Sequence, residues 1–192
     1  MLHVVDAGRY RRQVNAVGSG DILSFTSPDA SFDVLGGLQH FSEINSGSDK
    51  LIVYNLTASG SSANAYIGDN VATVAAGSTA VSIKLNPSML FPFSSPYQRF
   101  FIVDEAITYF ISSGQLSRYH GYSYGATQYS PISGSGDLVA KYLVLANSDF
   151  TYDPGSASRG GLVTIQLALE DMVRATGERI TLLHQVHVDN AP

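Results

Sequence analysis

The chain has 192 residues, a net charge of −5 and no cysteine. Its length fits one domain of ordinary size, and 44% hydrophobic residues with only 14% charged ones exclude a disordered chain. The absence of cysteine excludes a disulfide framework and a thiolate metal site. Arg9, Arg11 and Arg12 lie together, but no basic stripe of the kind that binds nucleic acid runs along the chain.

The first half of the chain is typical of short strands separated by turns. Short apolar segments rich in β-branched residues predict strands, and clusters of Gly, Pro, Ser and Asp predict the turns between them. The strands and short apolar segments expected here are Leu2–Val5, Asp21–Phe25, Phe32–Leu35, Lys50–Leu56 and Ala80–Leu85. The breaks expected between them are a turn or a single helical turn over Asp6–Arg12, an irregular helical turn within Tyr66–Ala76, and an end to the last strand at Asn86-Pro87.

The segment Gln98–Tyr124 predicts two strands around a tight turn. Phe100–Ile111 is dense in β-branched and aromatic residues, Ser112–Gly114 has turn composition, and Leu116–Tyr124 is again aromatic and strand-like. Because Phe100–Val103 is apolar at every position, the first strand is expected to be central and covered on both sides.

The last third predicts one helix and a long hairpin. Leu138–Ala146 alternates poorly and is the best candidate for a helix, and Asp149–Tyr152 predicts a strand. Leu162–Leu169 and Glu178–Asp189 both alternate apolar with polar residues, which predicts an antiparallel C-terminal hairpin. The chain is therefore expected to be a single, mainly β domain over residues 1–192, with antiparallel sheets and few short helices.

No segment carries a motif of catalysis or cofactor binding. A nucleophile elbow would require Gly-x-Ser-x-Gly, and a phosphate-binding loop would require a Gly-rich turn between a strand and a helix; neither pattern is present. We therefore expect a protein that is not an enzyme and that has no cofactor.

His184 and His187 have the spacing His-x-x-His, which on a helix would suggest a metal site. On the predicted strand they point to opposite faces. His184 then shares a face with Ile180, Leu182 and Val186, so we expect a hydrogen-bonded core histidine instead of a metal ligand.

Two pairs of residues offer oxygen ligands of the type that calcium prefers: Asp69 with Asn70, and Asp149 with Asp153. Neither pair has the spacing of a calcium loop, and such residues commonly form turns. Turn formation is the expected role, with calcium binding as the alternative.

Four tyrosines near the centre of the chain are the candidate contact residues: Tyr119, Tyr122, Tyr124 and Tyr129. Tyrosine combines a large apolar area with a polar tip, so such a cluster suits a protein interface or a sugar-binding surface. The alternative is that about half of them simply pack on the sheet. A protein interface is the favoured functional interpretation.

Several segments, in the same order along nearly the whole chain, resemble the periplasmic domain of the MSHA biogenesis MshO family of minor pilins. The most specific are Gly114–Tyr122 (GQLSRYHGY) and Leu182–Pro192 (LLHQVHVDNAP), and the others are Ala7–Arg11, Phe32–Gly36, Ala65–Asn70 and Arg99–Asp104.

This resemblance implies a type IV pilin-like protein, similar in class to the J-type pseudopilins of type II secretion. Such proteins have an α+β fold in which a long N-terminal helix anchors the subunit in the inner membrane and packs in the filament core. The strand-like start at Met1 fits the removal of that helix, and no apolar run here approaches the roughly 20 residues that span a bilayer.

By the same resemblance, the expected function is that of a minor pilin, a structural subunit in the assembly-initiating or tip complex of an MSHA-like pilus in a Gram-negative bacterium. The expected partners are other minor pilins, the major pilin and, through the missing helix, the inner membrane, with no nucleic acid. The expected location is the periplasmic face of that membrane and the pilus. The alternative is a tip adhesin that binds surface glycans through the tyrosine-rich region. Without the helix, little self-association is expected.

The chain departs from the family at two positions. Related sequences commonly carry one cysteine at the place of Ile111 and another at the place of Asp149. The resemblance therefore implies that the strands holding these two residues are neighbours, held together here by packing.

Overall fold

The computed structural model describes residues 1–57, 60, 62–122, 125, 134–153, 161–171 and 177–188. The described chain forms two compact units. The first is built on Met1–Ala106, and the second on Ile107–Tyr122 together with the described residues from 134 to 188. The sequence contains no linker that predicts this division.

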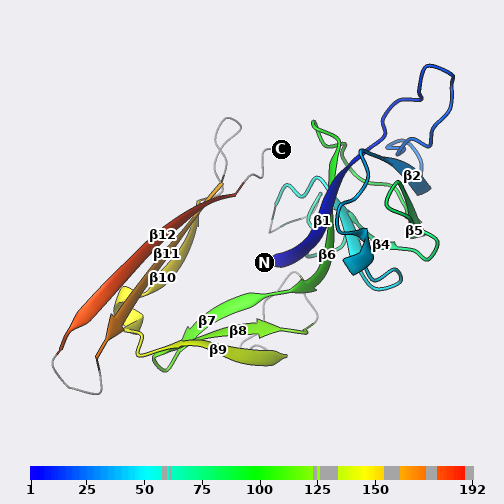
Figure 1. Ribbon diagram of the computed structural model, residues 1–192. Coiled ribbons are helices and arrows are strands. Elements are labelled where there is room, and N and C mark those ends of the chain that lie inside the picture. The colour runs from blue at the N-terminus through cyan, green and yellow to red at the C-terminus, as the bar shows by residue number, and fades with distance from the viewer. Residues whose placement is uncertain are drawn as a thin grey trace. The chain divides into compact units, whose positions relative to one another are not determined.

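The first unit is a closed barrel of six antiparallel strands (Figure 1). The strands are β1 (Leu2–Tyr10), β2 (Asp29–Leu35), β3 (Lys50–Val53), β4 (Val71–Val74), β5 (Ser82–Met89) and β6 (Arg99–Ala106). Their order around the barrel is β1-β2-β5-β4-β3-β6, and β6 pairs back with β1 from Leu2↔Ala106 to Arg9↔Arg99. A short 3₁₀ helix, η1 (Phe41–Glu43), lies between β2 and β3.

Aromatic side chains fill the centre of the barrel. The rings of Tyr10 and Phe32 meet edge to face at 6.4 Å, and those of Phe32 and Phe100 at 5.3 Å. Ile102 lies in the same core, whereas Val103, on the other face of β6, packs in a second cluster with Ile52 and Ala65. The prediction that Phe100–Val103 is covered on both sides is therefore confirmed.

Two predicted breaks in the barrel are wrong, and only the one in β5 coincides with irregular pairing, since β1 pairs regularly with β6 from Asp6↔Ile102 to Arg9↔Arg99. β1 continues through Asp6–Tyr10, where a turn was expected, and its register with β6 shifts twice near Val4. β5 continues through Asn86-Pro87, a cis peptide bond, and its register with β2 jumps between Ser31 and Asp29. Such bulges interrupt the alternation that marks a strand, and they accommodate a proline that cannot donate to the ladder.

The second unit contains two antiparallel sheets of three strands each among its described residues. The first sheet has the order β7-β8-β9, and the second has the order β10-β11-β12. Their bounds are β7 (Thr108–Ser112), β8 (Gln115–His120), β9 (Ser135–Lys141), β10 (Asp149–Asp153), β11 (Gly161–Glu170) and β12 (Arg179–Val188). With the barrel, these sheets confirm the mainly β, antiparallel fold class.

The predicted central pair of strands is divided between the two units. Its first strand, expected over Phe100–Ile111, is β6 and β7, separated by Ile107 alone. The turn at Ser112–Gly114 is confirmed, because Ser113 and Gly114 both have positive φ (51° and 71°), as a two-residue hairpin turn requires.

The helix expected over Leu138–Ala146 is wrong. This segment contains most of β9 and a 3₁₀ helix, η2 (Leu145–Asn147). The pairing of β9 with β8 passes from Leu116↔Ala140 to Ser117↔Leu138, which leaves Val139 as an extra residue. This bulge breaks the period of two, so the strand has the apolar spacing of a poor helix.

The C-terminal hairpin is confirmed, with β11 and β12 paired from Gly161↔Val188 to Glu170↔Arg179. Two expectations that concern its sheet are wrong. His184 is exposed and not a core histidine, because both faces of β12 are exposed from Arg179 to His187. Ile111 in β7 and Asp149 in β10 belong to different sheets, so their strands do not pair as neighbours.

The two sheets of the second unit are joined at one segment. Leu143 N–H donates to the Gly114 carbonyl at the β7–β8 turn (3.0 Å), and Val144 N–H donates to the Ala168 carbonyl of β11 (2.8 Å). Leu143 and Ala168 are both buried at this joint. Within the described residues, no helix is long and apolar enough to cross a membrane.

Candidate functional site: an aromatic face of the sheet β7-β8-β9

The candidate site is built from residues that lie directly opposite one another on β7, β8 and β9. Tyr119 of β8 lies between Thr108 and Gly136, and the next row on the same face is Phe110, Ser117 and Leu138. Opposed residues of an antiparallel pair point to the same side. We call this side of the sheet the aromatic face. Phe110 is 41% exposed and Leu138 is 50% exposed.

Gly136 gives the Tyr119 ring its position. A Cβ atom at Gly136 would lie 2.8 Å from Cε1 and 3.1 Å from Cζ of Tyr119. The ring therefore lies against the backbone of β9, in space that any larger residue would occupy. A tyrosine on a strand whose ring covers a cross-strand glycine is held in one orientation, so it loses little entropy when a partner binds.

Tyr122 joins this group through a hydroxyl contact. Its Oη and Thr108 Oγ1 form a hydrogen bond of 2.5 Å, and Thr108 is the residue opposite Tyr119. The structure thus brings two of the four predicted contact residues, Tyr119 and Tyr122, to one place. The other two, Tyr124 and Tyr129, lie outside the described residues.

The opposite side of the same sheet is charged. Asp137 Oδ2 lies 3.1 Å from His120 Nε2 and 3.9 Å from Arg118 Nη1. Arg118 lies opposite Tyr109, so these groups are on the same side of the sheet as Tyr109 and Ile111 of β7. The opposite side therefore combines this charged group with Tyr109 and Ile111, whereas the aromatic face has one charged residue, Lys141, in the end row with Ser112 and Gln115.

The proposed calcium positions have other roles. The carboxylate of Asp69 accepts the backbone N–H groups of Ser62 and Asn64, both at 2.6 Å, and so shapes its own loop. Asp149 Oδ1 accepts the N–H of Phe150 at 2.8 Å. Across the part of the chain that the structure describes, no cluster of three or more His, Asp or Glu side chains is placed to hold a metal ion.

Sequence reasoning missed two histidine–carboxylate pairs on the barrel. His3 Nδ1 lies 2.8 Å from Asp104 Oδ1, and His40 Nδ1 lies 3.1 Å from Glu43 Oε1. All four side chains line one shallow hollow. His3 and Asp104 are 101 residues apart and meet only because β1 pairs with β6. No local pattern in the sequence could have shown this.

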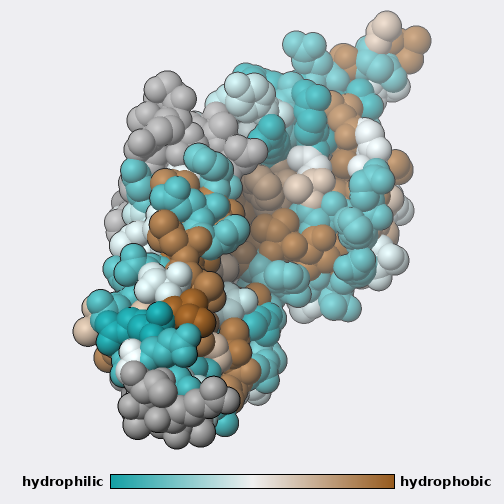
Figure 2. Space-filling view, turned by 60° about the vertical axis from the view of Figure 1, so that its left-hand side comes forward, coloured by the Kyte–Doolittle hydropathy of each residue, from teal (hydrophilic) through white to brown (hydrophobic). Residues whose placement is uncertain are grey.

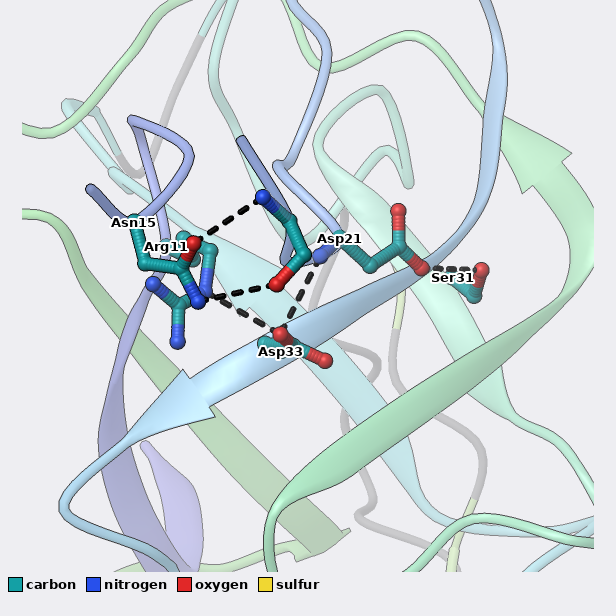
Figure 3. A network of polar contacts seen from close by, with 6 residues as sticks. Arg11, Asn15, Asp21, Ser31 and Asp33 are labelled. Atoms are coloured by element: carbon teal, nitrogen blue, oxygen red, sulfur yellow. Dashed lines mark hydrogen bonds and ion pairs between the residues drawn. The ribbon is translucent and has the colours of Figure 1, made fainter. Parts of the chain in front are cut away.

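A polar network holds the loop that follows β1 (Figure 3). Asp33 Oδ2 accepts from Arg11 Nε at 3.0 Å and from the Asp21 N–H at 3.1 Å, while Ser31 Oγ donates to Asp21 at 2.6 Å. Further along the loop, Asn15 Oδ1 accepts two backbone N–H groups. These contacts close the base of a loop whose tip carries exposed valines.

Comparisons with known proteins give no assignment for this arrangement: no family model, no curated protein and no solved structure matches the chain.

Proposed function

We propose that this chain is a structural subunit that works by binding other proteins through its aromatic face, as a minor pilin of an MSHA-like type IV pilus. The observation that carries the proposal is the row arrangement on β7, β8 and β9. It sets the fixed ring of Tyr119 beside the exposed side chains of Phe110 and Leu138.

This surface has the composition of an interface centre. Buried anchor residues at protein interfaces are enriched in tyrosine and other aromatics, and charged residues are depleted at the centre. Here the charged residues Arg118 and Asp137 lie on the opposite side of the sheet, and Lys141 lies on the aromatic face in its end row, beside Gln115 and away from Tyr119. The ring of Tyr119 is already positioned by Gly136, which lowers the entropic cost of binding.

The kind of partner comes from the resemblance described above. In a minor pilin, an N-terminal helix would enter the filament bundle and tether the subunit at the inner membrane. The β-rich part of the chain would then contact neighbouring minor pilins or the major pilin on the periplasmic side. In this proposal the chain assembles a complex and catalyses no reaction.

Co-purification of the full-length protein with the minor pilins encoded beside it tests the proposal. Phe110→Ala removes an aromatic residue from the aromatic face, and Tyr109→Ala removes its neighbour, 39% exposed, from the opposite side of the same strand. Retention of a pilin that falls for Phe110→Ala and not for Tyr109→Ala supports the proposal. Retention that both variants leave unchanged contradicts it.

The glycan-binding alternative also has a specific observation in its favour. A tyrosine ring held flat against the sheet by Gly136, next to the hydroxyl groups of Thr108 and Tyr122, offers a stacking surface beside polar atoms. In this alternative the chain is a tip adhesin. Glycan-array binding that Tyr119→Ala abolishes, with pilin retention unchanged, would favour the adhesin over the assembly subunit.

A further inference from the structure

The strand β12 forms one edge of the sheet β10-β11-β12 (Figure 1). Among the described residues it pairs with β11 alone, in a ladder that runs from Gly161↔Val188 to Glu170↔Arg179 without a register shift. Every residue of β12 from Arg179 to His187 is exposed. The strand therefore has one long side to which no other described strand is paired.

The backbone groups that point out from this edge can be identified from β11. The Ala168 carbonyl accepts from the Val144 N–H at 2.8 Å, and the Ala168 N–H donates to Ser148 Oγ at 3.0 Å. Neither partner belongs to β12, so the backbone groups of Ala168 point away from that strand. Ala168 lies opposite Thr181, and two opposite residues of an antiparallel pair either bond each other or both point away. The backbone groups of Thr181 therefore point outward, and so do those of every second residue of β12. These outward residues are Arg179, Thr181, Leu183, Gln185 and His187.

The other edges of the second unit carry features that prevent strand addition, whereas β12 does not. β7 and β10 have only 5 residues each. β9 contains the bulge at Val139 and the charged side chains of Asp137 and Lys141. Short strands, bulges and edge charges are the features by which proteins block pairing with another chain. β12 has 10 residues, a regular ladder, and no proline, lysine or carboxylate, and its arginine, Arg179, already pairs with Glu170 at 3.0 Å.

The side chains along this edge alternate between two faces. The face that β12 shares with the aliphatic residues of β11 holds Ile180, Leu182, His184 and Val186. Ile180 is 58% exposed and Leu182 is 54% exposed. Figure 2 shows apolar side chains at the surface of the part of the molecule turned toward the viewer. The opposite face includes the polar side chains of Thr181 and Gln185. A strand added here would match these rows with apolar residues at every second position and polar residues between them.

We infer that β12 binds an extended segment of a partner protein, which joins the sheet as a further strand. The row of outward N–H and C=O groups supplies main-chain hydrogen bonds to such a segment, and the alternating side chains select its sequence. The inference rests on the proposed function for the kind of partner, which in a pilus would be a neighbouring pilin. It adds a second contact surface to the aromatic face.

A different protein suits this edge better than a second copy of the chain. Each copy has a net charge of −5, so two copies repel each other at neutral pH, whereas a neutral or basic segment is not repelled. A second β12 in antiparallel register, centred on Leu183, would also place Arg179 opposite His187 and Leu182 opposite His184, with no carboxylate on either strand. A compact small molecule cannot use the edge, because only an extended chain presents donors and acceptors at the spacing of a strand.

Hydrogen exchange on the full 192-residue chain tests the inference. In the free chain the amides of Leu182 and His184, which donate to β11, should exchange slowly, and those of Thr181, Leu183 and Gln185 should exchange fast. The probe is a short synthetic peptide that alternates valine and threonine between terminal lysines. Its binding, in the micromolar range or weaker, should slow exchange at the outward amides. The same peptide with its central valine replaced by proline is the control and should protect them less. Outward amides that still exchange fast at millimolar peptide overturn the inference.

A pair of variants at one position separates backbone pairing from side-chain contact. Leu183→Pro removes an outward N–H and leaves the ladder to β11 intact, because the Leu183 amide does not donate to it. Peptide binding should weaken about tenfold or more. Leu183→Ala loses the same side chain but keeps the N–H, so it should bind nearly as the parent does. Equal weakening by both variants overturns the inference. If Leu183→Pro does not fold, Gln185→Pro and Gln185→Ala make the same comparison.

Co-purification of the full-length protein with the neighbouring pilins then identifies the source of the segment. A pilin that is lost with Leu183→Pro and kept with Leu183→Ala supports the inference. A pilin that stays bound while the outward amides still exchange fast overturns it and leaves the proposed function standing. If no pilin is retained by the parent, the proposed function fails, and the peptide result still decides whether the edge accepts a strand. Outward amides that slow as the concentration of the chain alone rises would assign the edge to a second copy and overturn the inference.

Discussion

Gly8 of β1 and Phe100 of β6 lie directly opposite each other, and the Phe100 ring fills the space that a side chain at position 8 would take. A Cβ atom on Gly8 would lie 2.6 Å from Cζ of Phe100 and 3.1 Å from Cδ2 of Leu38. Phe100 is fully buried, so its ring has no free space to move into. This pair links the closing seam of the barrel to its aromatic core.

Gly8→Ala is therefore expected to lower the free energy of unfolding by about 1–3 kcal/mol through overpacking. Chemical denaturation measures the change. Phe100→Leu in the same chain makes room for the new methyl group, so the double variant should lose less than the sum of the two single losses. A Gly8→Ala protein as stable as the parent would show that the seam is looser than these distances indicate.

Tyr10 is expected to make barrel stability sensitive to alkaline pH. Burial raises the pKa of Tyr10 above its ordinary value of 10.0, although its hydrogen bond to the Ser95 backbone and the positive charge of Arg12 oppose this. Below the ordinary pKa, both folded and unfolded chains keep the proton and stability is unaffected. As pH rises above it, the unfolded chain releases the proton first, so the free energy of unfolding falls.

Tyr10→Phe separates the ionisation of Tyr10 from the ionisation of the other tyrosines. Near neutral pH the variant should lose about 1 kcal/mol, because the hydrogen bond from Tyr10 Oη to the Ser95 carbonyl (3.2 Å) is gone. Above the ordinary tyrosine pKa of 10.0 the difference from the parent should narrow, because a phenylalanine ring cannot ionise. Thermal unfolding across the alkaline range measures both. A constant difference at every pH would contradict the predicted role of Tyr10.

Asp33→Ala is expected to loosen the loop between β1 and β2. The change leaves the Asp21 N–H without its acceptor and Arg11 without its ion pair, at a cost of about 1–2 kcal/mol. Hydrogen exchange at the Asp21 amide should accelerate. Asp21→Ala is the control, since it removes only the carboxylate that accepts from the exposed Ser31 hydroxyl, and it should have a smaller effect on stability.

Gly136→Val is expected to displace the Tyr119 ring without altering Tyr119 itself. Valine suits a strand, so the fold should persist, but its side chain would occupy the position of the ring. Under the proposed assembly function, retention of a pilin partner should fall, because the displaced ring no longer lies beside Phe110 and Leu138. Ser135→Val, on the preceding residue and the opposite side of β9, should retain the partner. Equal retention by both valine variants would remove Tyr119 from the interface.

The sequence predicts strands that pair with the next strand along the chain. It does not predict pairing between strands that are far apart in the sequence. Leu162–Leu169 and its partner strand could be predicted because alternation is regular and the strands follow one another. The barrel could not, because Leu2 pairs with Ala106 and no local signal records that contact. The false helix over Leu138–Ala146 arose from the bulge at Val139, which mimics a helical period.

The candidate site was partly predictable, because part of it lies on the hairpin of the consecutive strands β7 and β8. Tyr119 was identified from composition, and the turn at Ser113-Gly114 fixes which residue of β7 faces it, so Thr108 follows from counting back along the hairpin. Leu138 does not follow, because the bulge in β9 shifts the register by one residue. The contact of Tyr122 with Thr108 depends on a side-chain hydrogen bond that no pattern of residues encodes.

The pairing of β1 with β6 also determines when the barrel can close during synthesis of the chain. All six barrel strands lie within the first 106 residues, but the first strand made must wait for the last before the ring closes. At about 5–20 residues per second, the outer edge of β1 stays open on the ribosome for roughly five to twenty seconds.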